Sequence, residues 1–139
     1  MNADTLPILG QPFEGLPLTF VRSIEEYEGP ILSELSDDSG TPYLEKAVDC
    51  SRDQKIFRSL VVVSSPHAIE EYLAGRMSML DLLTLPNESK GILVDTKFRT
   101  GERTGEVVRS ARVDISTLPS GYLPDPTAMY DETLDPKWR

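Results

Sequence analysis

The sequence lacks the residues on which several classes of protein depend. It contains one cysteine, Cys50, and one histidine, His67. A single cysteine excludes an internal disulfide and a Cys-x-x-Cys metal or redox site, and this favours a reducing compartment. No run approaches the roughly 18 apolar residues of a membrane span, and the N-terminus lacks the cationic start and apolar core of a signal peptide. We therefore expect a soluble, cytoplasmic protein without a membrane segment.

Positive charge is scarce in the first third of the chain. Residues 1–53 hold 11 acidic side chains against 3 basic ones, and the whole chain of 139 residues has a net charge of −9. A surface of this sign repels phosphate backbones and attracts basic surfaces. General nucleic-acid binding is therefore disfavoured, and the favoured partner is another protein with a basic surface. The alternative is that the charge serves only solubility.

Proline and glycine, in contrast, are plentiful. Eleven prolines and nine glycines predict many turns and short elements. We expect an N-terminal arm over residues 1–17, a single domain over 18–118 and a proline-rich, extended tail over 119–139. The alternation of β-branched and aromatic residues predicts strands that form an antiparallel meander. These strands are expected near Phe20 and Val21 and over residues 31–35, 41–51 and 55–65.

Side chains alternate along the strand expected over 41–51, so its residues divide between the two faces of the sheet. One face is predicted to hold Tyr43, Glu45, Ala47 and Asp49, and the other Leu44, Lys46, Val48 and Cys50.

Two short helices are predicted after the fourth strand. Ser65 followed by Pro66 is typical of a helix start, because serine caps backbone amides and proline at the first helical position loses no hydrogen bond. Gly75 favours a break, and Ser78 begins a second capping pattern. The segments "ILVDTKF" and "VVRSARVDI", with glycine-rich residues between them, predict a second hairpin. The expected fold is α+β: an antiparallel meander sheet, two short helices packed on it, a second β-hairpin and an extended C-terminal tail.

The order of these signals resembles an uncharacterised family of small bacterial and phage-borne proteins, a domain of unknown function. The resemblance covers roughly residues 18–124. It rests on Tyr27, Gly29, Pro30, Tyr43, Leu44, Leu73, Gly75, Ser78, Leu80, Leu123 and Pro124. The resemblance implies a compact sheet with a helical lid in an intracellular microbial setting, in host defence or its counteraction. It implies no activity.

No catalytic residue, metal or cofactor is predicted. A general base needs a nucleophile or an orienting carboxylate within hydrogen-bond reach, and His67 falls in the first turn of a helix beside Ala68, so a surface or capping role is favoured. Nothing next to Cys50 would activate its thiol. The loop "SDDSG" lacks the alternating ligands and the distal glutamate of a calcium loop.

The leading functional hypothesis is a non-catalytic protein-interaction module, with a second copy of the chain as another partner to consider. Aromatic side chains dominate interface energetics, so the tail supplies candidate anchors. The candidate partner-binding residues are Glu25, Glu26, Glu28, Asp37, Asp38, Tyr122, Tyr130 and Trp138. One alternative is a small metal-dependent hydrolase or nuclease that uses the acidic residues. Another is a nucleotide or small-ligand sensor, with Arg76, Arg109 or Arg112 meeting the phosphate.

Overall fold

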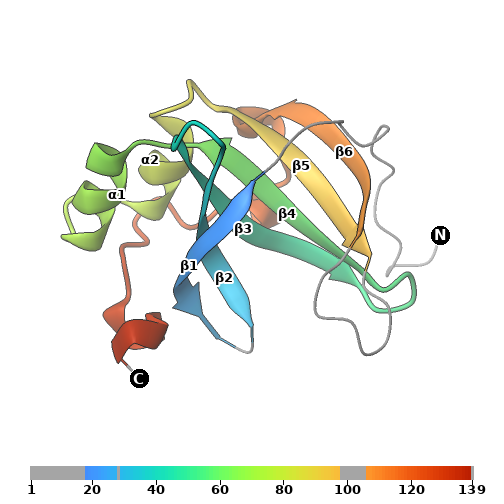
Figure 1. The fold of residues 1–139 in the computed structure, drawn as a ribbon, viewed down its shortest axis with the longest axis horizontal. Helices are drawn as coiled ribbons and strands as arrows, with labels where there is room; N and C mark the ends of the chain where they lie inside the picture. The colour runs from blue at the N-terminus through green and yellow to red at the C-terminus, as the bar shows by residue number, and fades with distance from the viewer. Residues whose placement is uncertain (1–17, 28, 98–105, 139) are drawn as a thin grey trace.

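The computed structural model describes residues 18–27, 29–97 and 106–138 (Figure 1). The six strands form one antiparallel sheet in chain order. They are β1 (Thr19–Glu26), β2 (Pro30–Ser36), β3 (Pro42–Ser51), β4 (Ile56–Val63), β5 (Lys90–Lys97) and β6 (Glu106–Asp114). The helices α1 (Pro66–Leu73) and α2 (Met79–Thr84) separate β4 from β5. The α+β meander predicted from the sequence is confirmed. The expected arm at 1–17 and the loop at 98–105 lie outside the described residues.

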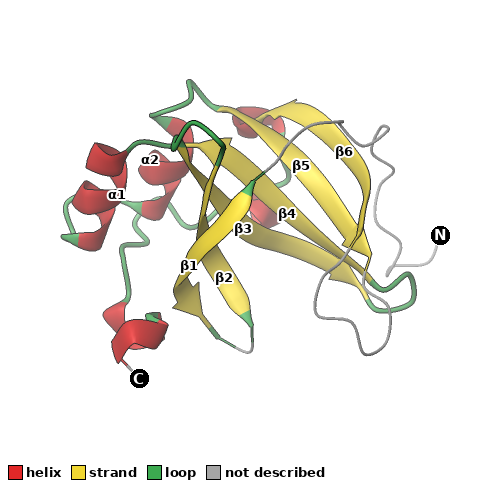
Figure 2. Cartoon of the chain, in the orientation of Figure 1, coloured by secondary structure: helices red, strands yellow, loops and turns green. Residues whose placement is uncertain are grey.

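The two helices lie together beside one end of the sheet (Figure 2). They pack on one of its faces, because Leu44, Leu60 and Leu93 belong to the same buried cluster as Ile69 and Leu82. We call this the helix face. The pairing of Leu60 with Leu93 across β4 and β5 shows that the sheet presents these residues to the same side.

The opposite face carries the alternate residues of the same strands. Val61 pairs with Ile92 across β4 and β5, and Tyr43 pairs with Val63 across β3 and β4. We call this the groove face, because it is hollowed between β3 and β6.

A β-bulge between Ala47 and Asp49 changes the expected alternation in β3. Tyr43 pairs with Val63 on the groove face, but Asp49 pairs with Arg58, which lies on the helix face. The extra residue of a bulge redirects the side chains that follow it. The prediction that Asp49 shares a face with Tyr43 was therefore wrong, and Cys50 takes the groove side opposite Phe57.

The helix signals of the sequence correspond to observed caps. The Ser65 hydroxyl accepts a hydrogen bond from the Ala68 amide at 3.1 Å, and Pro66 begins α1. Gly75 follows α1 with a φ of 76°, a left-handed conformation that glycine adopts without steric cost. Ser78 then caps α2 through the Asp81 amide at 3.1 Å. The predicted break at Gly75 is confirmed.

The tail begins behind the sheet and ends beside β1 and α1 (Figure 1). The segment that follows β6 contains four single-turn 3-10 helices, of which the first lies before the tail predicted at 119–139: η1 (Ile115–Thr117), η2 (Ser120–Tyr122), η3 (Glu132–Leu134) and η4 (Pro136–Trp138). The first two helices bury Ile115 and Tyr122 in the main core. The tail therefore completes the helix face as well as running along the surface.

Candidate functional site

Four charged residues form a continuous row across β3, β4, β5 and β6. Asp49 pairs with Arg58, Arg58 with Asp95, and Asp95 with Arg109. The Arg58 guanidinium donates to both carboxylate oxygens of Asp95, with Nε to Oδ1 at 2.7 Å and Nη2 to Oδ2 at 2.8 Å. Arg109 Nη2 lies 3.1 Å from Asp95 Oδ2. The signs alternate along the row, so each charge lies beside its opposite.

The centre of this row is buried beneath Tyr122. The side chains of Arg58 and Asp95 are 1% and 0% exposed. Arg58 Nη1 donates to the Tyr122 hydroxyl at 3.3 Å, and this hydroxyl donates to Asp49 Oδ2 at 2.9 Å. Burial raises the pKa of the Tyr122 hydroxyl, and its hydrogen bond to Asp49 adds to this effect against the lowering by Arg58. The phenol therefore stays protonated and links the tail to the sheet, which makes the row a structural network.

A second polar cluster joins β1, α1 and the tail. The hydroxyl of Tyr72 donates to the buried carboxylate of Glu25, and the hydroxyl of Tyr130 donates to Asp135. The rings of Tyr72 and Tyr130 meet edge to face, with centroids 5.6 Å apart and an interplanar angle of 82°. Burial raises the pKa of the Glu25 carboxyl, and the negative charges of Asp131 and Asp135 raise it further, while the Tyr72 hydrogen bond opposes this.

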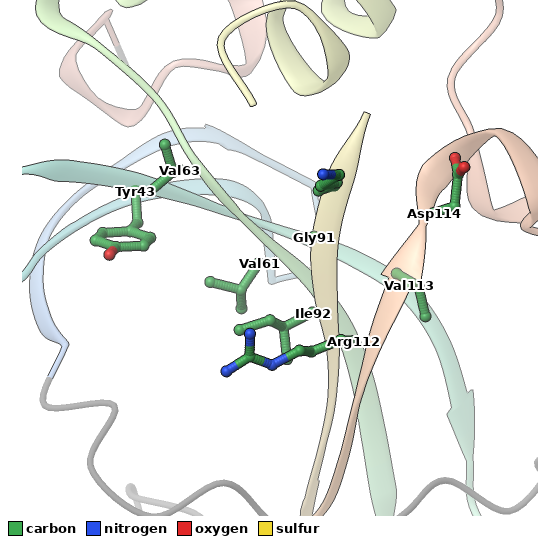
Figure 3. Close-up of a pocket in the computed structure, with 9 residues that line it drawn as sticks. Tyr43, Val61, Val63, Gly91, Ile92, Arg112, Val113 and Asp114 are labelled. Atoms are coloured by element: carbon green, nitrogen blue, oxygen red, sulfur yellow. The ribbon is translucent and has the colours of Figure 1, made fainter. Parts of the chain in front are cut away.

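The groove face holds a cavity of about 500 Å³ (Figure 3). Its wall consists of apolar side chains from two neighbouring strands, namely Val61 and Val63 of β4 and Ile92 of β5. Tyr43 lies on the β3 side, and the guanidinium of Arg112 lies next to Ile92 on the β6 side. The remaining lining residues are Lys90, Gly91, Val113 and Asp114.

Among the described residues, the lining of the groove carries charges of both signs. Arg112 and Lys90 contribute two positive charges and Asp114 one negative charge. The Asp114 carboxylate already accepts hydrogen bonds from the amide and hydroxyl of Ser116, at 3.0 and 2.7 Å. These two hydrogen bonds lower the pKa of Asp114, so it remains ionised and bound to η1.

A third surface is the edge of the sheet formed by β1, the first strand in the sheet order. Within the described chain, no strand pairs with its outer side. Three large apolar side chains of β1 and the following turn are exposed: Phe20 by 60%, Val21 by 48% and Tyr27 by 67%. An apolar sheet edge is a template for pairing with another extended chain.

The acidic residues predicted to bind a partner have different environments. Glu25 is buried against Tyr72, and Glu26 is half-buried at the end of β1. Asp37 stabilises the β2–β3 turn by accepting hydrogen bonds from the amides of Ser39 and Thr41, both at 2.9 Å. Asp38 is exposed in the same turn, and Glu28 lies outside the described residues.

The aromatic candidates in the tail are used largely within the protein. Tyr122 is buried in the core, and Tyr130 packs on Tyr72. Trp138 ends η4, and its side chain lies outside the description. Tyr122 is buried and Tyr130 is half-buried, so both rings make contacts within the protein.

Of the three arginines predicted to meet a phosphate, only Arg112 lines the groove. Arg109 lies on the helix face beside Asp95. Arg76 is exposed between α1 and α2 and pairs with Glu71 at 2.9 Å. The three side chains therefore do not form one site.

The other reactive side chains do not converge. His67 is exposed in the first turn of α1, and Cys50 is exposed on β3. Within the described ranges, no group of three or more histidine, cysteine, aspartate or glutamate side chains could hold a metal ion.

Sequence reasoning missed the charged row. The signal was an arginine and an aspartate inside two apolar runs, "KIFRSLVVV" and "GILVDTKF". Charges are almost never fully buried unless they are paired, so Arg58 and Asp95 were candidates for each other.

Neither helix in the described part of the chain has the length and apolar character that crossing a bilayer requires. Compared with protein-family models, curated proteins and solved structures, the chain matches none of them. The protein is thus defined by its fold, an α+β domain on a six-stranded meander, and by its two open surfaces, the groove and the β1 edge.

Proposed function

We propose that the protein is a non-catalytic binding module that holds an extended, basic segment of another protein along the outer edge of β1. The observation that carries this proposal is the exposure of Phe20, Val21 and Tyr27 on that edge. Single exposed apolar residues are normal, but three on one sheet edge favour an interaction surface.

Strand addition explains how such an edge would bind. The outer amides and carbonyls of β1 supply main-chain hydrogen bonds to an extended segment, and the exposed side chains supply contacts that select its sequence. Phe20 and Val21 lie at the start of β1, whereas the tail carboxylates Asp131 and Asp135 lie near Glu25 and Arg22 of the same strand. The residues that precede Arg22 are therefore the part of the strand available for pairing.

Charge selects a basic segment over an acidic one. Residues 1–53, which include β1, β2 and β3, carry a net charge of −8. Near β1, Glu26 and the tail carboxylates Asp131 and Asp135 add negative charge, while Arg22 is paired with Glu34 at 3.0 Å. This field attracts lysine and arginine side chains and speeds their association at low ionic strength.

A peptide titration tests this proposal. Two peptides of about ten residues, the upper end of usual strand lengths, would alternate valine with either lysine or glutamate. Fluorescence anisotropy should show that the lysine peptide binds the full chain and that its affinity falls as salt is added. The glutamate peptide should not bind. Equal binding of the two peptides, or no binding of either, contradicts the proposal.

Matched lysine substitutions locate the binding surface. Phe20→Lys places a positive charge on the β1 edge. It should lower the affinity for the lysine peptide by about tenfold or more, because an apolar contact is lost and the charges repel. Phe57→Lys is the control, because Phe57 is similarly exposed, by 53%, but lies on β4. If both substitutions lower the affinity for the lysine peptide equally, the peptide does not bind at β1.

A further inference from the structure

We propose that the groove between β3 and β6 binds a small organic ammonium ion with an apolar body, and that Glu45 holds the ammonium group at the β3 side. This site lies on a face of the sheet and does not depend on the β1 edge. Its volume of about 500 Å³ falls within the range of roughly 300–1,000 Å³ that is usual for small-molecule sites.

Glu45 borders the groove on β3. It pairs with Val61, which lines the cavity, and it follows Tyr43, another lining residue, by two positions. Residues two apart along a strand lie on the same face of the sheet, and the β-bulge of β3 begins only after Ala47. The Glu45 side chain therefore belongs to the groove face, next to the apolar wall.

Within the described part of the chain, no basic side chain neutralises Glu45. Its cross-strand neighbours are Ser33 on β2 and Val61 on β4, and neither carries a charge. The side chain is half-buried, and burial alone raises the pKa of its carboxyl. A carboxylate that has lost water and gained no donor is stabilised by a cation that reaches it. The β3 side of the groove therefore favours a positively charged ligand.

The cations of the groove have interactions of their own. The pKa of Asp114 is lowered by its hydrogen bonds from Ser116 and further by the charge of Lys90, so Lys90 and Asp114 offset each other. Arg112 also interacts within the protein, and it lies on β6, three strands from Glu45. Neighbouring strands are about 4.8 Å apart, so this separation is roughly 14 Å along the sheet. A cation at Glu45 is thus kept apart from Arg112.

The wall of the groove fits the apolar body of the ligand. Val61, Val63 and Ile92 line the cavity, and Tyr43 lies beside them (Figure 3). Val61 pairs with Ile92 across β4 and β5, so these side chains form one surface. The face of an aromatic ring attracts an ammonium group, and Tyr43 is about 6.8 Å from Glu45 along the strand. An alkyl chain on this wall places its ammonium group near both residues.

A titration with three ligands of equal chain length tests the inference: octylammonium, octanol and octanoate. NMR amide signals of the full chain should move at Tyr43, Val61 and Ile92 when octylammonium is added. Octanol should bind about tenfold more weakly or worse, because it lacks the charge, and octanoate should bind least. Equal affinity for octylammonium and octanol, or shifts confined to other parts of the chain, would overturn the proposal.

Matched glutamine substitutions separate the groove from the net charge of the protein. Glu45→Gln should lower the affinity for octylammonium by about tenfold and leave that for octanol unchanged, because only the cation uses the carboxylate. Glu70→Gln removes the same charge from the exposed side of α1 and should leave both affinities unchanged. If the two substitutions lower the affinity for octylammonium equally, the net charge attracts the ligand and the groove does not hold it.

A substitution in the wall tests the apolar part of the site. Val63→Asn makes the wall polar and should lower the affinities for octylammonium and octanol alike. Circular dichroism of each variant confirms that it is folded before the titration. Unchanged affinities for both ligands in folded Val63→Asn would show that they bind elsewhere, against the proposal.

Discussion

Asp95 is a fully buried charge inside the sheet. Its carboxylate is completely buried, and it is neutralised by the bidentate hydrogen bonds from Arg58 and by the proximity of Arg109. Removing two charges from water costs several kcal/mol for each ion, and this cost is offset only when the geometry and the hydrogen bonds are good. The row has both, since Tyr122 uses a further donor of Arg58 and binds Asp49.

Replacing Asp95 with asparagine should therefore destabilise the protein strongly. Asp95→Asn removes the carboxylate charge to which Arg58 donates two hydrogen bonds, and breaking such a buried pair typically costs about 3–5 kcal/mol. Urea unfolding followed by circular dichroism measures the change. Asp38→Asn makes the same chemical change in an exposed turn and should stay within about 0.5 kcal/mol of the wild type. Similar unfolding free energies for the two variants would show that the row does not hold the sheet.

At the scale of elements, the helices follow closely from local sequence. Ser65, Pro66 and Ser78 act through backbone groups a few residues away, so their effect needs little tertiary context. The positive φ of Gly75 is likewise a local requirement. For this reason the positions of α1 and α2 were predictable from the sequence.

Removing the N-cap of α1 should lower the free energy of unfolding by a modest amount. Ser65→Ala deletes the acceptor of the Ala68 amide, and loss of a helix N-cap typically costs about 1 kcal/mol. Thermal unfolding would measure this as a lower midpoint. Ser120→Ala is the comparison, because Ser120 is exposed and the N-cap position of η2 is Pro119. A midpoint for Ser65→Ala no lower than that of Ser120→Ala would rule out the cap as a source of stability.

The strands illustrate where local pattern stops being informative. The alternation of side chains along β3 correctly places Leu44 and Tyr43 on opposite faces of the sheet. It places Asp49 on the wrong face, because the bulge after Ala47 arises from the pairing of β3 with β4. The groove was also not predictable, since Tyr43, Ile92 and Arg112 come from strands that meet only in the folded sheet. Arg112 was selected from the sequence for its charge alone.

At the scale of the whole molecule, the tail is docked by tyrosines and carboxylates. Glu25 of β1, Tyr72 of α1 and the tail residues Tyr130 and Asp135 form one contact region. Because burial raises the pKa of Glu25, the folded protein holds this proton more tightly than the unfolded chain does. The stability that this group contributes is complete below its ordinary pKa of 4.5 and is lost as the pH rises through the raised value.

Replacing Glu25 with glutamine should restore the folding stability that the wild type loses as the pH rises. Glu25→Gln keeps an oxygen that can accept from Tyr72 and removes the buried charge, so the variant should be more stable than the wild type at pH 7. The difference should shrink as the pH falls towards 4.5 and below, where the wild-type carboxyl is protonated. Urea unfolding across this pH range measures it. Glu70→Gln, on the exposed side of α1, should show no such gain. A variant that is less stable than the wild type at pH 7 would contradict the sign of the effect.

The sequence by itself determined the α+β class, the meander of the first strands, the second hairpin, the two helices and their caps, because these depend on alternation and on contacts between near neighbours in the chain. The pairing of β4 with β5, which joins the hairpin to the meander, was decided by the tertiary structure. Only the tertiary structure decided that Asp49, Arg58, Asp95 and Arg109 form one row, that Tyr122 is buried, and that Arg112 borders a groove. These features depend on strand register and on residues as far apart as Asp49 and Tyr122. Such pairings are selected by the burial of the whole sheet and have no local signature.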